Sequence, residues 1–496
     1  MSQVAQLLVP VLAADADGRF DAARADADRA LALGVGGFML YGGEQEAVRV
    51  LAKDLQQRSR TPLLIGADLE RGAGQQFGGA TGLPPLSAVA WLDDPEALRR
   101  AARLTAREAR TMGVNWNLSP VCDLDPTGSS PVLGTRVLGG DAAAVSRRAA
   151  AFIEACQAEG VLACAKHFPG LGRAEEDAHT HRPVVRADRE ALHAEDLAPF
   201  RAAFAANVAS VMTAHVAYPA LDPSGLPATL SREVITWLLR QQLRYDGLVV
   251  TDAMDMEGVL GAAGSEGEAA VRAVAAGCDV LLAVRDAAGT AVALERALVT
   301  GALDPARAQQ SVRRRLKWAQ WASPPNDWRR PSASDAVWGA QLADRVVHVV
   351  RGDPAPMGDA IDVLVVDATA PAAPARAGAG RAGVAREGAL VATLRAAGID
   401  ARRVEGFSAD TRGNAAVVAY FAGHGGAGDD DVAGAVRDAA AEGVRAGRAV
   451  TVLHFAHPRG APEVDPGAAV VCAWSGDRAM QQAAARWVIA RRGAGV

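Results

Sequence analysis

One polar stretch near the middle of the chain carries the densest set of side chains that can move a proton or hold a polar ligand. Residues 166–183 read KHFPGLGRAEEDAHTHRP and follow the short apolar run GVLACA. A run of that length, with a glycine before it and a proline after it, predicts a buried strand with Lys166 and His167 at its carboxyl end. Asp177 and His179 lie two residues apart in the loop beyond, so the carboxylate can orient the imidazole and stabilise its protonated form.

A solvated surface turn is the alternative interpretation of this stretch. For one histidine in a loop we would favour that alternative, because most such residues only face water. Here three histidines, a lysine and an aspartate lie beside one strand end, and so dense a group of titratable side chains indicates a functional site.

Composition limits the class of protein. The chain has 496 residues, of which 50% are hydrophobic and 22% charged, so it is long enough for one large and one smaller globular domain. Its net charge of −5 gives no electrostatic reason to expect binding to nucleic acid or to an anionic membrane. No apolar run has the length of a membrane span, and the first residues lack the pattern of a signal peptide. We therefore expect a cytoplasmic protein, and small neutral ligands stay open.

The cysteines favour the same compartment. Their number is odd, they are widely spaced, and most lie in apolar runs, so we expect buried free thiols rather than disulfides or a zinc site. The five residues are Cys122, Cys156, Cys164, Cys278 and Cys472.

Strand-like runs alternate with helical patterns about eight times before residue 325. Parallel strands need helical crossovers, and eight such units close into a (β/α)₈ barrel. The expected strands are 6–13, 36–41, 62–68, 115–121, 161–167, 210–216, 247–252 and 280–284. The expected helices include 21–33, 95–112, 142–159, 189–206, 232–243 and 265–276, which carry apolar residues at three- and four-residue spacing.

Polar side chains gather where these strands end. In barrel enzymes the chemistry lies where the strands meet the loops that follow them. The residues at such positions are Asp68, Asp123, Arg136, Lys166, His167, His215 and Asp252, whereas strand interiors are almost without polar side chains. The sequence therefore predicts one shared pocket at the carboxyl ends of the strands.

A polar segment with three prolines divides the chain. We expect a catalytic barrel over residues 1–322, a linker over 323–335 and a smaller α/β domain over 336–496. The second domain should contain strands 360–366, 415–421, 449–454 and 468–473, with helices 387–397, 431–446 and 478–491. For the glycine-rich segment 421–426 we favour a structural turn, because it lacks the spacing of a phosphate-binding motif.

The motifs at the strand ends resemble glycoside hydrolase family 3, and specifically its bacterial β-N-acetylglucosaminidase branch. The resemblance lies in KHFPG at 166–170, the Asp177-x-His179 pair, AHV at 214–216 and YDGLVVTD at 245–252, in the expected order and separation. It runs across the whole barrel, and the segment from Ala473 onward is similar to the second domain of longer members.

This resemblance implies a role for each residue. Asp252 would be the catalytic nucleophile, His179 the general acid/base and Asp177 the partner that tunes it. The residues expected to hold the hydroxyls and the acetamido group of the sugar are Asp68, Arg136, Lys166 and His167, with Gln76 and His215 as further substrate contacts. The Asp-x-His pair separates this branch from the family's β-glucosidases, whose acid/base is usually a glutamate from another region.

The loop after the third expected strand departs from the family pattern. The family commonly reads DQEGGRVxR there, whereas residues 68–76 read DLERGAGQQ. Gln76 thus replaces a sugar-binding arginine, and it can donate hydrogen bonds but brings no charge. Leu171 replaces a usual histidine and Ala253 a frequent aspartate. These changes leave the groups needed for the chemistry in place and bear on substrate preference.

The same residues suit glycosidic cleavage on chemical grounds. Cleavage with retention needs a carboxylate at the anomeric carbon and a proton donor at the leaving oxygen, and Asp252 and His179 supply the two. An imidazole with a pKa near 6.5 can be an acid in the first step and a base in the second, and Asp177 increases its protonated fraction.

We therefore expect a retaining exo-β-N-acetylglucosaminidase that removes terminal β-linked N-acetylglucosamine and needs no metal or organic cofactor. The resemblance implies muropeptides as its source. Three alternatives stay open: a phosphorylase, in which phosphate rather than water resolves the glycosyl-enzyme, a β-glucosidase or β-xylosidase, and a carbohydrate-binding protein without catalysis. Because no motif residue lies beyond residue 325, we expect a chain that ends near Ser323 to keep activity.

Overall fold

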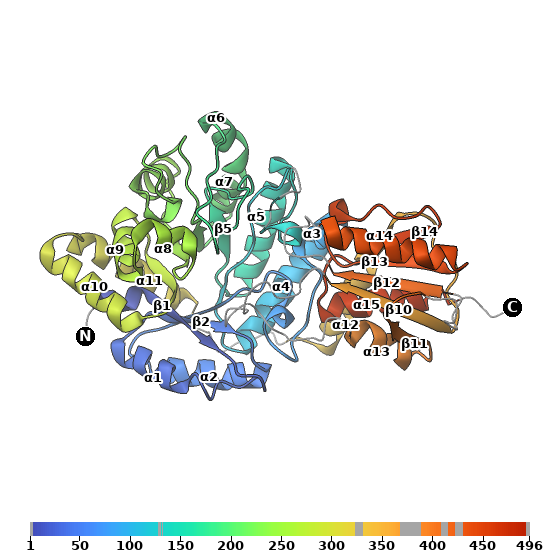
Figure 1. Cartoon of the computed structure of the whole chain (residues 1–496). Coiled ribbons are helices and arrows are strands. Elements are labelled where there is room, and N and C mark those ends of the chain that lie inside the picture. The colour runs from blue at the N-terminus through green and yellow to red at the C-terminus, as the bar shows by residue number, and fades with distance from the viewer. Residues whose placement is uncertain are drawn as a thin grey trace.

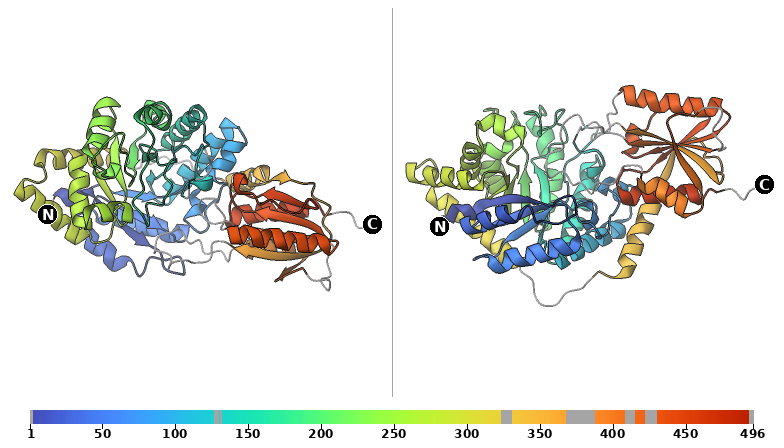
Figure 2. Two further views of the ribbon diagram at one scale, coloured as in Figure 1. Left: turned by 45° about the horizontal axis from the view of Figure 1, so that its top comes forward. Right: turned by 60° about the horizontal axis from the view of Figure 1, so that its bottom comes forward.

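Two α/β domains lie side by side in the computed structural model (Figure 1). The structure describes residues 3–126, 130, 132–322, 331–367, 388–407, 415–421 and 430–492. The N-terminal domain is a barrel, and the smaller second domain, coloured orange to red, contacts one side of it (Figures 1 and 2).

Eight parallel strands form the barrel, in the order β4-β3-β2-β1-β8-β7-β6-β5. Backbone hydrogen bonds join its end strands, since Asn117 N donates to Leu162 O at 2.8 Å and Cys122 N to Lys166 O at 2.6 Å. The strands are β1 (Leu8–Ala13), β2 (Gly37–Tyr41), β3 (Leu64–Ala67), β4 (Trp116–Asn117), β5 (Cys164–Phe168), β6 (Ser210–Thr213), β7 (Leu248–Ala253) and β8 (Val280–Val284). Each overlaps a strand expected from the sequence, so the predicted (β/α)₈ architecture is confirmed.

Apolar side chains from all eight strands meet in the barrel interior. They include Val9, Met39, Leu64, Trp116, Cys164, Met212, Val250 and Leu282. The largest, Trp116, is fully buried, and its Nε1 donates a hydrogen bond to Ser210 Oγ at 2.8 Å. The outer face of the strands packs against helices, and burial on both faces explains why the strands appear in the sequence as apolar runs.

Helices surround the strands as crossover connections. They are α1 (Arg24–Leu33), α2 (Gln45–Arg58), α3 (Leu86–Trp91), α4 (Pro95–Thr111), α5 (Ala142–Ala158), α6 (Arg189–Ala191), α7 (Ala198–Ala205), α8 (Glu257–Ala263), α9 (Glu266–Ala276), α10 (Ala287–Thr300) and α11 (Pro305–Trp321). Aspartate side chains fix several starts: Asp94, Asp141 and Asp304 accept backbone N–H groups at the first turns of α4, α5 and α11. The single helix expected over 189–206 is interrupted by the π-helix Leu192–Asp196, and Glu233–Gln242 is also a π-helix.

The second domain is a six-stranded sheet in the order β11-β10-β12-β13-β14-β9. Its strands are β9 (His348–Arg351), β10 (Ala360–Asp367), β11 (Asp400–Val404), β12 (Ala415–Phe421), β13 (Ala449–His454) and β14 (Ala468–Cys472), of which only β9 is antiparallel to its neighbour. Its helices are α12 (Ala333–Val346), α13 (Gly388–Ala396), α14 (Asp430–Arg445) and α15 (Arg478–Ile489). Two apolar clusters lie on opposite faces of the sheet, one under α12, α13 and α15 and one under α14.

The open α/β sheet expected for the second domain is present, but three details differ from the sequence prediction. β9 and β11 were not expected, because both are short and carry exposed polar or charged residues. Residues 333–335, expected as the end of the linker, form the first turn of α12, where Ser332 and Asp335 make a capping box. Residues 323–330 of the linker and 422–426 of the glycine-rich segment lie outside the described part of the chain.

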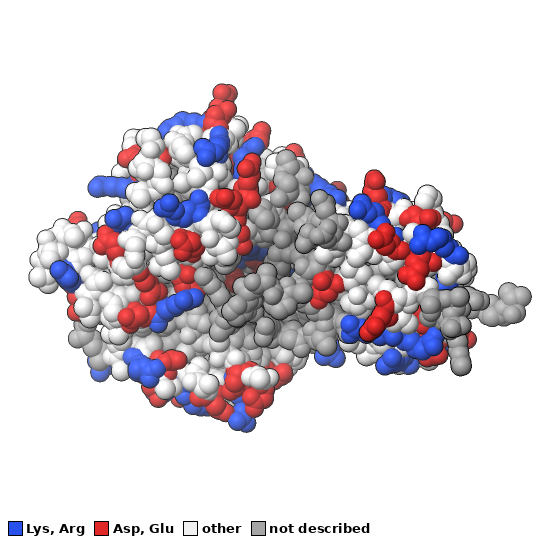
Figure 3. Space-filling model, viewed as in Figure 1, with Lys and Arg blue, Asp and Glu red and all other residues white. Residues whose placement is uncertain are grey.

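Three further observations concern the cysteines, the surface charge and the lengths of the helices. All five cysteines are buried free thiols. On the face shown in Figure 3, basic and acidic side chains are interspersed, and the described residues form no continuous basic patch there. Among the helices of the described residues, none has the length and apolar character needed to cross a membrane.

Candidate active site

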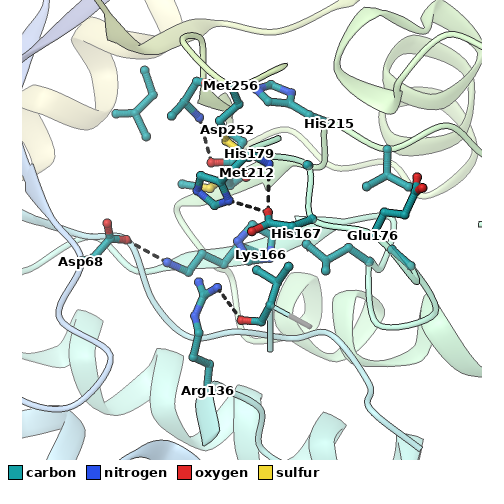
Figure 4. Close-up of a pocket in the computed structure, with 18 of the residues that line it drawn as sticks. Asp68, Arg136, Lys166, His167, Glu176, His179, Met212, His215, Asp252 and Met256 are labelled. Atoms are coloured by element: carbon teal, nitrogen blue, oxygen red, sulfur yellow. Dashed lines mark hydrogen bonds and ion pairs between the residues drawn. The ribbon is translucent and has the colours of Figure 1, made fainter. Parts of the chain in front are cut away.

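A pocket lies at the carboxyl ends of the barrel strands (Figure 4). Eight of the nine candidate residues line it: Asp68, Arg136, Lys166, His167, Asp177, His179, His215 and Asp252. Gln76 is buried, is not among the described residues that line the pocket, and accepts a hydrogen bond from Gly42 N at 3.4 Å through its Oε1. The structure thus brings eight residues together, and a contact between Gln76 and a ligand stays a prediction.

Asp252 lies near the end of β7 and inside the pocket. Its Oδ1 accepts a hydrogen bond from Ala253 N at 2.8 Å. Burial opposes ionisation of this carboxyl group, but the surrounding imidazoles, of which His167 contributes most, hold the pKa of Asp252 below its ordinary value. Asp252 is therefore an ionised carboxylate near neutral pH.

Asp177 and His179 form a hydrogen-bonded pair that lines the same pocket. Asp177 Oδ1 lies 2.7 Å from His179 Nδ1 and accepts the His179 backbone N–H at 2.8 Å. The hydrogen bond with the carboxylate raises the pKa of His179 above its ordinary value, against the opposing effect of partial burial. Because Nδ1 faces Asp177, Nε2 is the ring nitrogen left to face a ligand, and the side chain is 51% exposed.

The loop that carries His179 is bound to the segment that follows Asp252. Gly258 N, in the first turn of α8, donates to Ala178 O at 2.9 Å. In Figure 4 the His179 ring lies next to Asp252, and the charges of the two residues influence each other's pKa. One short segment therefore connects the loop that carries the His179 imidazole to the strand that carries the Asp252 carboxylate.

Two cations and two carboxylates make a second group beside the pocket. Lys166 Nζ lies 2.8 Å from Asp68 Oδ1 and 2.7 Å from Glu70 Oε1. Arg136 binds Glu70 through two hydrogen bonds, from Nε to Oε2 at 3.0 Å and from Nη2 to Oε1 at 2.9 Å. Burial would raise the pKa of Glu70, but the two cations hold it well below its usual range. Glu70 thus joins Arg136 and Lys166, whose charged donors suit hydroxyl and amide oxygens of a ligand.

The buried Asp123 positions His167. Its carboxylate lies 2.7 Å from His167 Nδ1 and accepts the backbone N–H groups of His167 at 3.1 Å and of Leu171 at 2.8 Å. With Nδ1 engaged, His167 presents Nε2 as its remaining ring nitrogen in the pocket.

His215 contacts protein groups through both ring nitrogens. Nδ1 lies 2.7 Å from Thr229 Oγ1 and Nε2 lies 3.0 Å from Ala253 O. Burial lowers the pKa of His215, so the ring is neutral near neutral pH. The arrangement supports the backbone next to Asp252, and a direct contact between His215 and a ligand stays a prediction.

Sequence reasoning missed two residues of this site. Glu70 was passed over although it lies two positions after Asp68, a spacing that places both carboxylates on one side of an extended segment. Tyr41 ends β2 and lines the pocket. Burial, and then the charges of Asp68 and Asp252, raise the pKa of Tyr41 well above its ordinary value, so its hydroxyl stays a neutral donor. The signal available in the sequence was the apolar run 37–41, because its last residue, Tyr41, is a polar side chain at the carboxyl end of an expected strand.

An ionised carboxylate at one strand end, an imidazole paired with a second carboxylate and a set of polar side chains in one pocket at the carboxyl ends of the strands are typical of the active site of a barrel enzyme. Residues 2–317 match the family model described as the glycosyl hydrolase family 3 N terminal domain. The chain belongs to glycoside hydrolase family 3.

Curated relatives match the barrel region. A protein of Thiobacillus denitrificans named beta-hexosaminidase is 38% identical over 258 residues, which is 50% of this chain and 71% of that protein. A protein of Cellulomonas fimi named beta-N-acetylglucosaminidase/beta-glucosidase is 36% identical over 293 residues, or 57% of this chain. That match spans 52% of the Cellulomonas fimi protein, about half of its length.

Solved structures match both domains. A family 3 β-N-acetylglucosaminidase from a Paenibacillus species superposes with a TM-score of 0.82 at 27% identity, covering 99% of this chain and 96% of that one. The beta-glucoside phosphorylase BglX also has a TM-score of 0.82, at 21% identity, covering 99% of this chain and 92% of that one. The second likeness shows a shared fold only.

Proposed function

We propose that the chain is a retaining exo-β-N-acetylglucosaminidase that hydrolyses terminal β-linked N-acetylglucosamine through a covalent glycosyl-Asp252 intermediate. The observation that carries the proposal is the Asp177–His179 pair beside the ionised Asp252 in one pocket. The names of the Thiobacillus denitrificans relative and of the Paenibacillus structure support the substrate class.

In the first step, Asp252 attacks the anomeric carbon. A bond forms between a carboxylate oxygen and that carbon, the bond to the leaving oxygen breaks, and its electron pair stays on that oxygen. His179 Nε2 gives its proton to the leaving oxygen, and Asp177 stabilises the imidazolium before the transfer. The raised pKa of His179 keeps more of the ring in the acid form at neutral pH.

In the second step, the now neutral His179 takes a proton from water. The water oxygen bonds to the anomeric carbon, the ester bond to Asp252 breaks, and the sugar leaves with its original anomeric configuration. Asp68, Lys166 and Arg136 hold the sugar in both steps, because their charged groups line the pocket and match hydroxyl and carbonyl oxygens.

Phosphorolysis is the second candidate, and one feature of His179 favours it. After the first step the imidazole is neutral, so it repels an inorganic phosphate less than a carboxylate base would. Phosphate would then replace water and leave as a sugar 1-phosphate.

We further infer that the substrates are peptidoglycan fragments and that the enzyme acts in the cytoplasm. The motif resemblance supports the first inference, and the five unpaired, buried cysteines support the second.

The test is a panel of aryl β-glycosides carrying N-acetylglucosamine, glucose or xylose, each assayed with and without phosphate. We expect the N-acetylglucosaminide to be cleaved with the highest kcat/KM, phosphate to have no effect, and NMR to show the β-anomer first. Preference for the glucoside or xyloside would overturn the substrate assignment, and a sugar 1-phosphate product would establish phosphorolysis. A chain that binds N-acetylglucosamine and turns over none of the glycosides would be a binding protein.

A further inference from the structure

The second domain contacts the barrel at two loops of the pocket. One loop carries Glu70 and the other carries Arg136. Arg459, in the segment after β13, donates from Nη1 to the backbone oxygen of Asp125 at 3.0 Å. Asp477, which caps α15, lies 3.5 Å from Arg71 Nε. Asp125 follows β4 in the segment that leads to Arg136, and Arg71 is the residue after Glu70. The first contact is therefore made to the backbone at the start of the segment that leads to Arg136, and the second to the side chain of the residue next to Glu70.

A third contact reaches the same pair through α3. Trp91, the last residue of α3, stacks on His348 of the second domain with ring centroids 4.0 Å apart, and Trp474 lies 6.2 Å from it. Within α3, Ser87 Oγ donates to Val137 O at 2.6 Å, and Val137 is the residue after Arg136. The helix that the second domain packs against thus holds the chain next to Arg136.

Asp125 packs closely against Gly139 and Gly140, which follow Arg136 in the chain, so a shift of Asp125 displaces the backbone that follows Arg136. Asp125 N donates to Gly139 O at 3.3 Å. A Cβ atom on Gly140 would lie only 2.8 Å from Asp125 O, the oxygen that Arg459 binds. Arg459 is itself oriented, since its backbone N–H donates to His457 Nδ1 at 3.2 Å, and the His457 ring meets Trp474 edge-on.

We infer that the second domain is a positioning element of the sugar-binding pocket, and that Arg459 and Asp477 are positioning residues that set Arg136 and Glu70 through Asp125 and Arg71. This inference rests on the proposed function, because the pocket groups concerned are those assigned to sugar binding. It concerns binding rather than bond cleavage, since Asp252 and the Asp177–His179 pair lie on β7 and in the loop after β5. A small displacement of a binding group is enough to lower the rate of a bound substrate's reaction or its affinity.

The test compares Arg459→Ala and Arg71→Ala with Arg345→Ala as a matched control. Arg345 also joins the domains, through a 2.9 Å contact with Asp94 at the start of α4, and its side chain has no hydrogen bond or ion pair with the described residues of either pocket loop. For each variant we would measure kcat and KM on an aryl N-acetylglucosaminide, the inhibition constant of N-acetylglucosamine, and the unfolding temperature.

We expect each of the two variants to raise KM and the inhibition constant together by about fivefold, because a displaced pocket group that loses one hydrogen bond to the sugar gives up about 1 kcal/mol of binding. We expect kcat to change by less than about twofold. Arg459→Lys should recover part of the loss, because its ammonium can still donate to Asp125 O. Arg345→Ala should leave KM and the inhibition constant unchanged even where it lowers the unfolding temperature.

In an active enzyme, an unchanged KM in both Arg459→Ala and Arg71→Ala would overturn the positioning role of the second domain. A rise in KM of the same size in Arg345→Ala would also overturn it. A wild-type chain with no turnover of any aryl glycoside would overturn the proposed function together with this inference, so the two failures are distinguishable.

Discussion

Asp252 and Glu70 are carboxylates of one pocket, yet their neighbours give them different tasks. The side chain of Glu70 is 6% exposed, and its carboxylate forms ion pairs with both Arg136 and Lys166. Its negative charge therefore neutralises and holds two cations of the protein. Asp252 is held ionised by imidazoles around it and accepts one hydrogen bond from its own neighbour Ala253. The first carboxylate is suited to positioning and the second to attack on a ligand.

At the same scale, the pH dependence should follow Asp252 and His179. Under the proposed roles, activity on a glycoside with a poor leaving group needs Asp252 ionised and His179 protonated. As pH increases, activity should therefore rise around the lowered pKa of Asp252 and fall around the raised pKa of His179. In Asp177→Ala the imidazolium loses its partner, and the alkaline limb of kcat/KM should move to lower pH. Glu175→Ala, a change of an exposed neighbouring carboxylate, is the control and should leave that limb in place.

Glu70→Gln tests the positioning role through stability. Removing the carboxylate leaves two adjacent cations without their shared partner, and we expect a loss of about 3 kcal/mol in the free energy of unfolding, measured by urea denaturation. Asp93→Asn, which removes a pair with Arg148 whose aspartate is 86% exposed, should cost less than about 1 kcal/mol. The pKa of Glu70 is lowered in the fold, so the advantage of the wild type is complete above about pH 4.5 and shrinks as pH falls below it. Equal losses in the two variants would contradict the role given to Glu70.

At the scale of elements, the sequence predicted the strands, which follow a repeating pattern. It did not predict contacts between residues that lie far apart in the chain. The eight strands and the residues at their carboxyl ends could be predicted, because both-sided burial leaves apolar runs and the barrel places strand ends together. The role of Glu70 could not, because its partners Arg136 and Lys166 lie 66 and 96 residues away in the chain. Gln76 was placed by a motif position alone, and the structure puts its side chain outside the described pocket lining.

Gly258→Ala tests whether α8 fixes the loop of His179. A Cβ atom there would lie 2.6 Å from His215 O and 3.2 Å from Ala178 O, so the methyl group must push α8 away from the His215 backbone and, with it, from the loop of His179. We expect kcat on a disaccharide to fall by at least about tenfold, because proton transfer needs His179 within hydrogen-bond reach of the leaving oxygen. Gly358→Ala, where no atom lies within 4 Å of the added Cβ, is the control. Equal activity of the two variants would show that the loop position does not depend on α8.

At the scale of the whole molecule, the residues that line the pocket and the residues proposed to position them belong to different domains. Every pocket-lining residue that the structure describes lies before residue 283, so the described pocket lining belongs to the barrel. The contacts of Arg459, Asp477 and Trp474 add a condition that the sequence did not indicate, because they join residues more than 300 positions apart.

A chain that ends near Ser323 should therefore keep catalysis but bind its substrate more weakly. Circular dichroism would show whether this shorter chain folds. For a folded chain we expect kcat within a few-fold of the full chain. We expect KM to rise by more than the about fivefold expected for one lost hydrogen bond, because the contacts of Arg459, Asp477 and Trp474 are all lost. A folded truncated chain with the KM of the full chain would contradict a positioning role for the second domain.

The central claim is that Asp252 is the nucleophile and His179 the acid/base, and the most direct measurement is mass spectrometry of His179→Ala treated with a dinitrophenyl β-N-acetylglucosaminide. This leaving group departs without a proton, so the first step should proceed, while the second step lacks its base and loses about 10²- to 10⁴-fold in rate. The account predicts an N-acetylglucosaminyl adduct on the peptide that contains Asp252, its release by azide, and no adduct in a variant that also carries Asp252→Ala. An adduct on another residue, or none while the glycoside is still consumed, would contradict it.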